Sequence, residues 1–230
     1  MKDHAMFRCE SEWMLTPYRL AVHEPTKTAV LADPHLGYND ARRRAGDAVP
    51  HVSLDEQLAP LKQACAVLDL AALVVAGDLC EARLDAEIVE QIRRGIADCG
   101  LELRAVVPGN HDRRWADFRD RLPMHPEGFS LGAWTVVHGD RTLPEGPVVM
   151  GHVHPAWRRG SLVEPCYLVR PNRLVLPAFS RDAAGGAVNN APRWLGYQAV
   201  AIDKDRVVDR GIVQQRQNPR QRPLRGFRKL

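Results

Sequence analysis

Five short motifs of the sequence bring together histidine, aspartate and asparagine, residue types that bind metal ions and transfer protons. The motifs are Asp33-Pro34-His35, Gly77-Asp78, Gly109-Asn110-His111-Asp112, His138-Gly139-Asp140 and Gly151-His152-Val153-His154. Five of the nine histidines of the chain lie in them. Carboxylate, imidazole and amide groups form a ligand set for divalent cations such as Mn²⁺, Fe²⁺ and Zn²⁺. The motifs therefore indicate a metal site.

The spacing within two motifs suggests how ligands are paired. Asp33 and His35 are two residues apart, as are His152 and His154, and on an extended chain such side chains point the same way. Each pair can hold one ion or straddle two. Cys80 is the one cysteine close to a motif, so the sequence disfavours a thiolate zinc site. The glycines of the motifs are expected to permit sharp turns and to leave room for a substrate.

Each motif follows a predicted buried strand. These strands span residues 28–32, 73–76, 103–107, 134–137 and 148–150. Predicted helices cover residues 53–68, with a capping box at Ser53 and Glu56, 85–98 and 113–122. From residue 160 onward the pattern predicts strands only, at 162–163, 167–169, 174–176, 197–202 and 207–213, with a hairpin turn at 203–205. This order predicts an α/β sandwich with a mixed sheet, whose strand ends gather the motifs at one edge.

Length and composition set the class of protein. The chain has 230 residues, of which 45% are hydrophobic and 26% charged, which excludes a mainly disordered chain and a fibrous repeat. No apolar run approaches the roughly 18 residues of a membrane span, and no apolar signal-peptide core is visible. Five scattered cysteines without a Cys-x-x-Cys pair indicate reduced thiols and a cytoplasmic location.

The charge divides the chain into two parts. Residues 214–230 contain six positive residues and no acidic one, and we predict a disordered basic tail after a single domain at residues 1–213. The tail is either a solubilising terminus or an arm that attracts a polyanion such as nucleic acid. Both readings stay open at this point.

The five motifs in this order resemble the calcineurin-like metallophosphoesterase superfamily, over about residues 28–180. The resemblance implies a four-layer α/β/β/α sandwich with two mixed β-sheets and a dinuclear metal site. It assigns two divalent ions, with Mn²⁺ expected before Fe²⁺ or Zn²⁺. By position, one ion would be held by Asp33, His35, Asp78 and His154, and the other by Asp78, Asn110, His138 and His152, with Asp78 bridging.

The resemblance also assigns residues to the reaction. His111 would face the substrate and either protonate the leaving oxygen or stabilise the phosphoryl oxygens, and Asp112 would orient it. Arg113 and Arg114 follow directly and either contact substrate phosphates or form a solvated helix start. Arginines 42–44, in the predicted loop after the first motif, either contact nucleic acid or form a wet surface.

Two further segments are similar to a narrower group within the superfamily. Leu31–Gly37 and Leu176–Phe179, with Gly185-Gly186 soon after, resemble small bacterial and archaeal phosphoesterases, some encoded with a DNA ligase and a helicase and others related to a repair nuclease. This implies a hydrolase of phosphodiester bonds in DNA or RNA, linked to DNA repair and to ligase- or helicase-associated proteins. A small-molecule phosphodiesterase or phosphatase is the alternative. A non-catalytic scaffold of the same fold is disfavoured because every expected ligand is present.

Overall fold

The computed structural model describes residues 6–10, 12–81, 86–183, 185–189 and 191–215. Of the predicted basic tail at residues 214–230, all but the first two residues lie outside this range. In the described part of the chain, no helix is both long enough and apolar enough to span a membrane.

The first sheet has six strands in chain order. They are β1 (Phe7–Cys9), β2 (Trp13–Leu15), β3 (Leu20–His23), β4 (Thr28–Ala32), β5 (Ala72–Ala76) and β6 (Glu102–Val107). Strands β1 to β4 pair antiparallel, whereas β4, β5 and β6 run parallel. The sequence pattern predicted the three parallel strands. Strands β4 and β5 are buried along their whole length and read as continuous apolar runs, whereas β6 is buried from Ala105 onward. The first three strands were not predicted.

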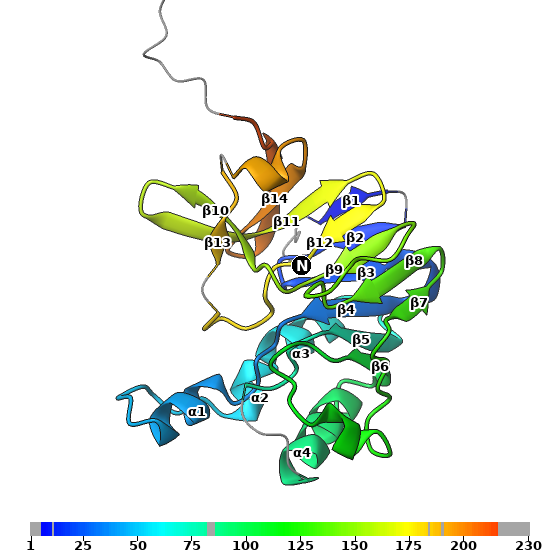
Figure 1. The fold of residues 1–230 in the computed structure, drawn as a ribbon, viewed down its shortest axis with the longest axis vertical. Helices are drawn as coiled ribbons and strands as arrows, with labels where there is room; N and C mark the ends of the chain where they lie inside the picture. The colour runs from blue at the N-terminus through cyan, green and yellow to red at the C-terminus, as the bar shows by residue number, and fades with distance from the viewer. Residues whose placement is uncertain (1–5, 11, 82–85, 184, 190, 216–230) are drawn as a thin grey trace, which may run out of the picture.

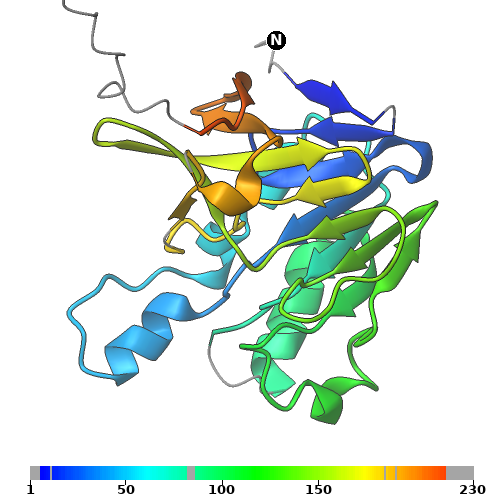
Figure 2. The ribbon, with the colours of Figure 1, turned by 45° about the horizontal axis from the view of Figure 1, so that its top comes forward.

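The second sheet has nine strands and is also mixed. They are β7 (Phe129–Leu131), β8 (Trp134–Val137), β9 (Val148–Met150), β10 (Pro155–Arg159), β11 (Leu162–Arg170), β12 (Arg173–Val175), β13 (Gly186–Ala187), β14 (Gln198–Asp203) and β15 (Arg206–Ile212). Strands β8, β9 and β12 run parallel. Strands β14 and β15 form the predicted hairpin. The predicted sandwich of two mixed sheets is therefore confirmed (Figures 1 and 2).

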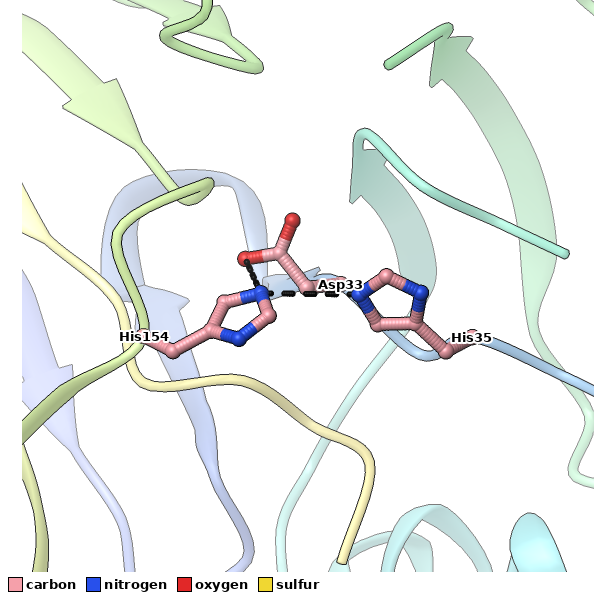
Figure 3. Close-up of side chains that lie close together, drawn as sticks. All are labelled: Asp33, His35 and His154. Atoms are coloured by element: carbon pink, nitrogen blue, oxygen red, sulfur yellow. Dashed lines mark hydrogen bonds and ion pairs between the residues drawn. The ribbon is translucent and has the colours of Figure 1, made fainter. Parts of the chain in front are cut away.

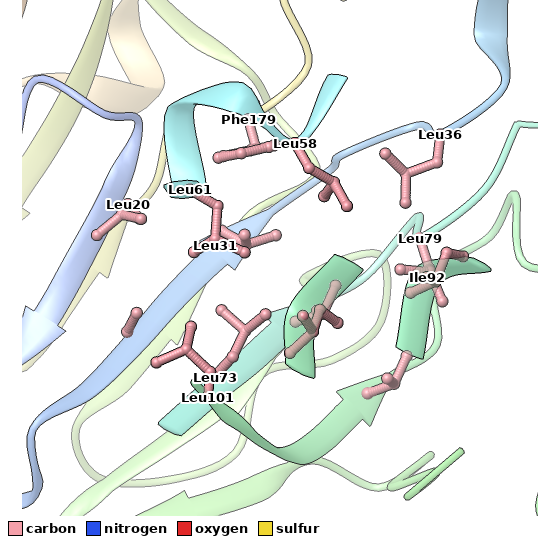
Figure 4. Packing of buried hydrophobic residues seen from close by; sticks show 14 of the residues in the cluster. Leu20, Leu31, Leu36, Leu58, Leu61, Leu73, Leu79, Ile92, Leu101 and Phe179 are labelled. Carbon is pink, nitrogen blue, oxygen red and sulfur yellow. The ribbon is translucent and has the colours of Figure 1, made fainter. Parts of the chain in front are cut away.

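Alternating side chains of the central strands build the layers. In β4, Val30 packs into the cluster shared with the second sheet, whereas Leu31 packs into the cluster beneath the helices. The cluster beneath the helices joins the first sheet to α2 (Leu54–Gln57), α3 (Ala59–Cys65) and α4 (Ala86–Ala97) through residues such as Leu61 and Ile92 (Figure 4). On the opposite outer face, Trp194 of the 3₁₀ helix η3 (Pro192–Trp194) packs with Leu168 of the second sheet.

Several predicted helices and strands differ from the structure. The predicted helix 53–68 is two helices, α2 and α3, because Pro60 in the first turn of α3 has no N–H to continue an α-helical ladder. Its capping box is present as predicted. The predicted helix 113–122 contains only the 3₁₀ helix η2 (Trp115–Phe118), which Arg114 precedes in a left-handed conformation. The strands predicted at 162–163 and 167–169 form one strand, β11, whose partner changes beside Pro165.

The segment after the first motif is a helix rather than a loop. Helix α1 (Tyr38–Arg44) carries the run of arginines 42–44 on its last turn, with all three side chains exposed. It extends away from the two sheets (Figures 1 and 2). Within the described residues its one buried side chain is Asn39.

Candidate metal centre

Strand register places the five motifs at the carboxyl ends of neighbouring strands. Ala32, Ala76 and Val107 end β4, β5 and β6 and are cross-strand partners. Val137 and Met150 end β8 and β9 and are partners in the second sheet. The motifs begin one residue after each strand, or two residues after β6, so both sheets deliver their polar side chains to the same edge.

A first cluster contains Asp33, His35 and His154, whose ligand atoms lie within 4.8 Å of one another. The Nε2 atom of His154 is 3.5 Å from Asp33 Oδ2 and 3.5 Å from His35 Nε2. Figure 3 shows the two rings beside the carboxylate with their Nε2 atoms directed toward each other. The three groups come from the ends of strands in different sheets, and they converge on one point.

A second cluster contains Asp78, His138 and His152, again with ligand atoms within 4.8 Å of one another. The Nε2 atom of His138 lies 3.1 Å from His152 Nδ1, 3.1 Å from Asn110 Oδ1 and 3.5 Å from Asp78 Oδ2. The other ring nitrogen, Nδ1, is 3.4 Å from the carbonyl oxygen of Ala76. Because that oxygen can only accept a hydrogen bond, Nδ1 carries the proton and Nε2 offers its lone pair to the cluster.

Asp78 lies between the two clusters. Its Oδ2 atom is 3.9 Å from His35 Nε2 in the first and 3.5 Å from His138 Nε2 in the second. Its Oδ1 atom accepts a hydrogen bond of 2.8 Å from the backbone N–H of His111. One oxygen is thus used to hold the side chain, and the other faces both sets of rings.

The electrostatics of the clusters fit bound cations. Asp33 is fully buried, and among the described residues its Oδ1 atom has no hydrogen-bond partner, although His138 Nδ1 lies 3.3 Å away. Burial raises the pKa of Asp33 well above its ordinary value, because a buried carboxylate without a counter-charge is unstable. Burial lowers the pKa of His138, which keeps the ring neutral and able to donate a lone pair. Lone pairs that face one another around buried carboxylates are the arrangement that divalent ions satisfy, so the residues fit a pair of them.

Glu81, which sequence reasoning missed, connects the first cluster to His111. Its Oε2 atom accepts from His35 Nδ1 at 2.7 Å, and its Oε1 atom accepts from His111 Nδ1 at 3.1 Å. Fixing the proton on Nδ1 of His35 directs the Nε2 lone pair of that ring toward His154 and Asp78. The one available sequence signal was an acidic residue three positions after Asp78.

Asp112 forms hydrogen bonds with the backbone of two loops of the site. Its carboxylate accepts three backbone N–H groups, from Leu79 at 3.1 Å, Cys80 at 3.1 Å and Gly109 at 2.9 Å. Burial nevertheless raises the pKa of Asp112 to about 6. Asp112 therefore ties the loop after β5 to the loop after β6, while the ring of His111 bonds to Glu81. That Asp112 orients His111 stays a prediction.

The two predicted substrate arginines lie on the surface. Arg113 and Arg114 are both exposed. Arg114 forms an ion pair with Asp117 in the first turn of η2. The prediction that they contact a substrate phosphate stays a prediction.

Backbone strain is concentrated at the clusters. Asp33, His35, Asp78, His152 and His154 all have positive φ, between 42° and 69°, a region that residues other than glycine seldom adopt. The expectation that Asp33 and His35 lie on an extended segment is therefore wrong. Backbone hydrogen bonds of 3.2 Å from Asp33 N–H to the Gly77 carbonyl and 2.9 Å from His35 N–H to the Asp78 carbonyl hold the turn. Strain of this kind typically marks functional sites.

Two glycines make room for ligands rather than for a substrate. A Cβ atom on Gly77, whose φ is +88°, would lie 1.9 Å from His138 Nδ1. A Cβ atom on Gly109 would lie 2.2 Å from Asp78 Oδ1. Side chains at these positions would displace the candidate ligands, so glycine is required by the site itself.

Comparison with known proteins places the fold. No family model matches the chain, and no curated protein does so either. Among solved structures, the chain is similar to the crystal structure of Pseudomonas putida nuclease MPE, with 21% sequence identity and a TM-score of 0.70. The match covers 89% of this chain and 98% of the other. The two proteins therefore share a fold.

Proposed function

We propose that this chain is a metal-dependent phosphoesterase that cleaves phosphodiester bonds of nucleic acid with the help of two divalent ions. The observation that carries the proposal is the pair of His/Asp clusters with Asp78 between them. Asp33, His35, Asp78 and His154 would hold one ion, and Asp78 would share the other with Asn110, His138 and His152. We propose Mn²⁺ because oxygen and imidazole donors are combined without thiolate.

Bound divalent ions supply Lewis acidity to a phosphoryl group and make water a better nucleophile near neutral pH. The protein groups around them position the substrate and handle its protons. The Nδ1–H group of His111 donates to Glu81, and a second proton, carried on Nε2 of the imidazolium ring, would pass to the departing oxygen, leaving the ring neutral. A positioned general acid contributes on the order of 10²–10⁴ in rate. With a side chain that is 42% exposed, His111 is accessible to an entering substrate.

Two observations support nucleic acid as the substrate class. The solved structure with a similar fold is that of a nuclease, and the motifs resemble phosphoesterases that act on DNA. The same resemblance supports a DNA-repair setting in the cytoplasm beside ligase- or helicase-associated proteins. A small-molecule diester or a phosphomonoester is the competing substrate.

A substrate panel tests the proposal. Chelator-stripped protein is reloaded with Mn²⁺, Fe²⁺ or Zn²⁺ and given single-stranded DNA and RNA oligomers, bis-p-nitrophenyl phosphate, cyclic nucleotides and p-nitrophenyl phosphate. We expect cleavage of oligomers and of the small diester, with activity restored by Mn²⁺. Asp78→Ala should lose metal and activity, whereas His111→Ala should keep the metal and lose turnover. An active Asp78→Ala protein without bound metal, or hydrolysis confined to the monoester, would overturn the proposal.

A further inference from the structure

One cavity adjoins the candidate metal centre on the side of His154, and a second cavity shares two of its lining residues. The inner cavity, of about 280 Å³, is lined by His154 together with Arg19 and Arg181. The outer cavity, of about 350 Å³, is lined by the same two arginines and by Lys204. Because Arg19 and Arg181 line both, the cavities meet at these side chains. A path lined by cations therefore leads away from the first metal cluster.

Arg19 is anchored at this junction. It lies in the turn between β2 and β3 with a φ of 60°, and its Nη1 group donates hydrogen bonds of 2.5 Å to the Ser180 carbonyl and 3.3 Å to the Ala178 carbonyl. The segment that accepts these bonds is itself joined to the metal centre, because the Ser180 N–H donates to the carbonyl of Asp33 at 3.2 Å. The guanidinium group is thus held in a defined place relative to the first cluster.

The protein balances the positive charge at the junction only in part. Within the described residues, neither Arg19 nor Arg181 forms an ion pair with a carboxylate. Burial and the nearby charge of Arg181 lower the pKa of Arg19. Each cavity contains one acidic residue, Asp182 in the inner and Asp205 in the outer. Both cavities keep an excess of positive charge, which favours an anionic ligand.

We propose that Arg19, Arg181 and Lys204 bind the backbone phosphates of a single nucleic-acid strand on one side of the bond that is cut. This inference rests on the proposed function and adds a binding site to it. Arginine binds phosphate through a fork of N–H groups, and lysine does so as a point charge. Pockets for small ligands measure roughly 300–1,000 Å³, so each cavity accepts about one sugar-phosphate unit rather than a base-paired duplex.

The test compares a polymeric substrate with a small one. Arg181→Ala, Lys204→Ala and the double variant, each as the full chain loaded with Mn²⁺, are assayed on a single-stranded oligonucleotide and on bis-p-nitrophenyl phosphate. We expect the KM for the oligonucleotide to rise about fivefold for each cation removed, the contribution of one partly exposed charge contact. The loss on the oligonucleotide should exceed the loss on the small diester. The slope of the logarithm of the oligonucleotide association constant against the logarithm of the salt concentration should become shallower by about 0.7 for each cation removed.

A matched control removes a charge elsewhere. Arg93→Ala takes an exposed guanidinium from α4, where it pairs with Glu90, and should leave oligonucleotide binding as in the wild type. Anisotropy of a fluorescein-labelled oligonucleotide with metal-free protein measures binding without turnover. The inference is wrong if Arg181→Ala matches Arg93→Ala in KM, anisotropy and salt slope, or if it weakens both substrates equally. Absence of all hydrolysis by the wild type would instead overturn the proposed function, and the anisotropy result would still decide the binding site.

Discussion

Replacing Gly77 by alanine should damage the metal centre through one atom. The new Cβ would lie 1.9 Å from His138 Nδ1, 2.3 Å from its Cγ and 2.7 Å from its Cβ. An ordinary contact begins at 3.4 Å, so the ring must retreat by about 1.5 Å. His138 is 2% exposed, and it lines a cavity of about 230 Å³ into which the ring can move. The retreat therefore separates its Nε2 atom from Asn110 and His152, both now 3.1 Å away.

Gly77→Ala should lower both the stability of the protein and its activity, for separate reasons. An alanine at the positive φ of Gly77 costs about 1–2 kcal/mol of stability, and overpacking adds about 1–3 kcal/mol. Gly46→Ala is the matched control, because Gly46 has a φ of +97° and nothing within 4 Å of an added Cβ. Displacing a ligand by about 1 Å should lower diester hydrolysis on the order of 10²-fold.

Urea unfolding of the metal-free proteins and hydrolysis of bis-p-nitrophenyl phosphate by the Mn²⁺-loaded proteins measure the two effects. Gly77→Ala should be less stable than Gly46→Ala by the overpacking contribution, and it alone should lose activity and metal. If the two variants have the same stability and the same activity, the placement of His138 against β5 is refuted.

Three other substitutions probe separate features. Asp78→Asn keeps an oxygen for the His111 N–H, so the stability of the metal-free protein should change by less than about 1 kcal/mol. Metal analysis should show loss of the second ion, and the diester assay should show loss of turnover. Two retained ions would contradict the bridging position. Glu81→Gln offers one acceptor oxygen for the rings of both His35 and His111, so kcat and Mn²⁺ affinity should fall about 10–100-fold with little change in KM. A Glu81→Ala protein with the kcat and Mn²⁺ affinity of the wild type would show that Glu81 does not orient these rings. Burial lowers the pKa of His23 in the folded protein. The unfolded chain therefore binds a proton at His23 more readily than the folded protein does, so the free energy of unfolding should fall as the pH drops below about 6.5. His23→Gln should show a smaller fall in thermal unfolding temperature between pH 7 and pH 5, and an equal fall in both proteins would show that other groups cause it.

Local patterns identified much of the fold. The five strands that precede the motifs are present, because apolar runs bounded by glycine and polar residues are a property of neighbouring positions. The capping box at Ser53 and the hairpin of β14 and β15 are likewise local and were predicted correctly. The short strands β1 to β3 were missed because three or four residues carry too little pattern to be distinguished from a turn. Helix α1 was missed because one side chain, Asn39, is buried on it and no apolar stripe marks it.

The sequence by itself determined which side chains could bind metal and that each follows a strand, because residue type and local order decide both. Only the tertiary structure decided their partners. His35 meets His154 across 119 positions and Glu81 across 46, and His152 turns to His138 although it is two residues from His154. These contacts depend on the register of strands in two different sheets and on left-handed turns at their ends, neither of which leaves a mark in local spacing. The same is true of Arg19, which reaches the edge of the metal centre only because the turn between β2 and β3 packs against residues 178–180.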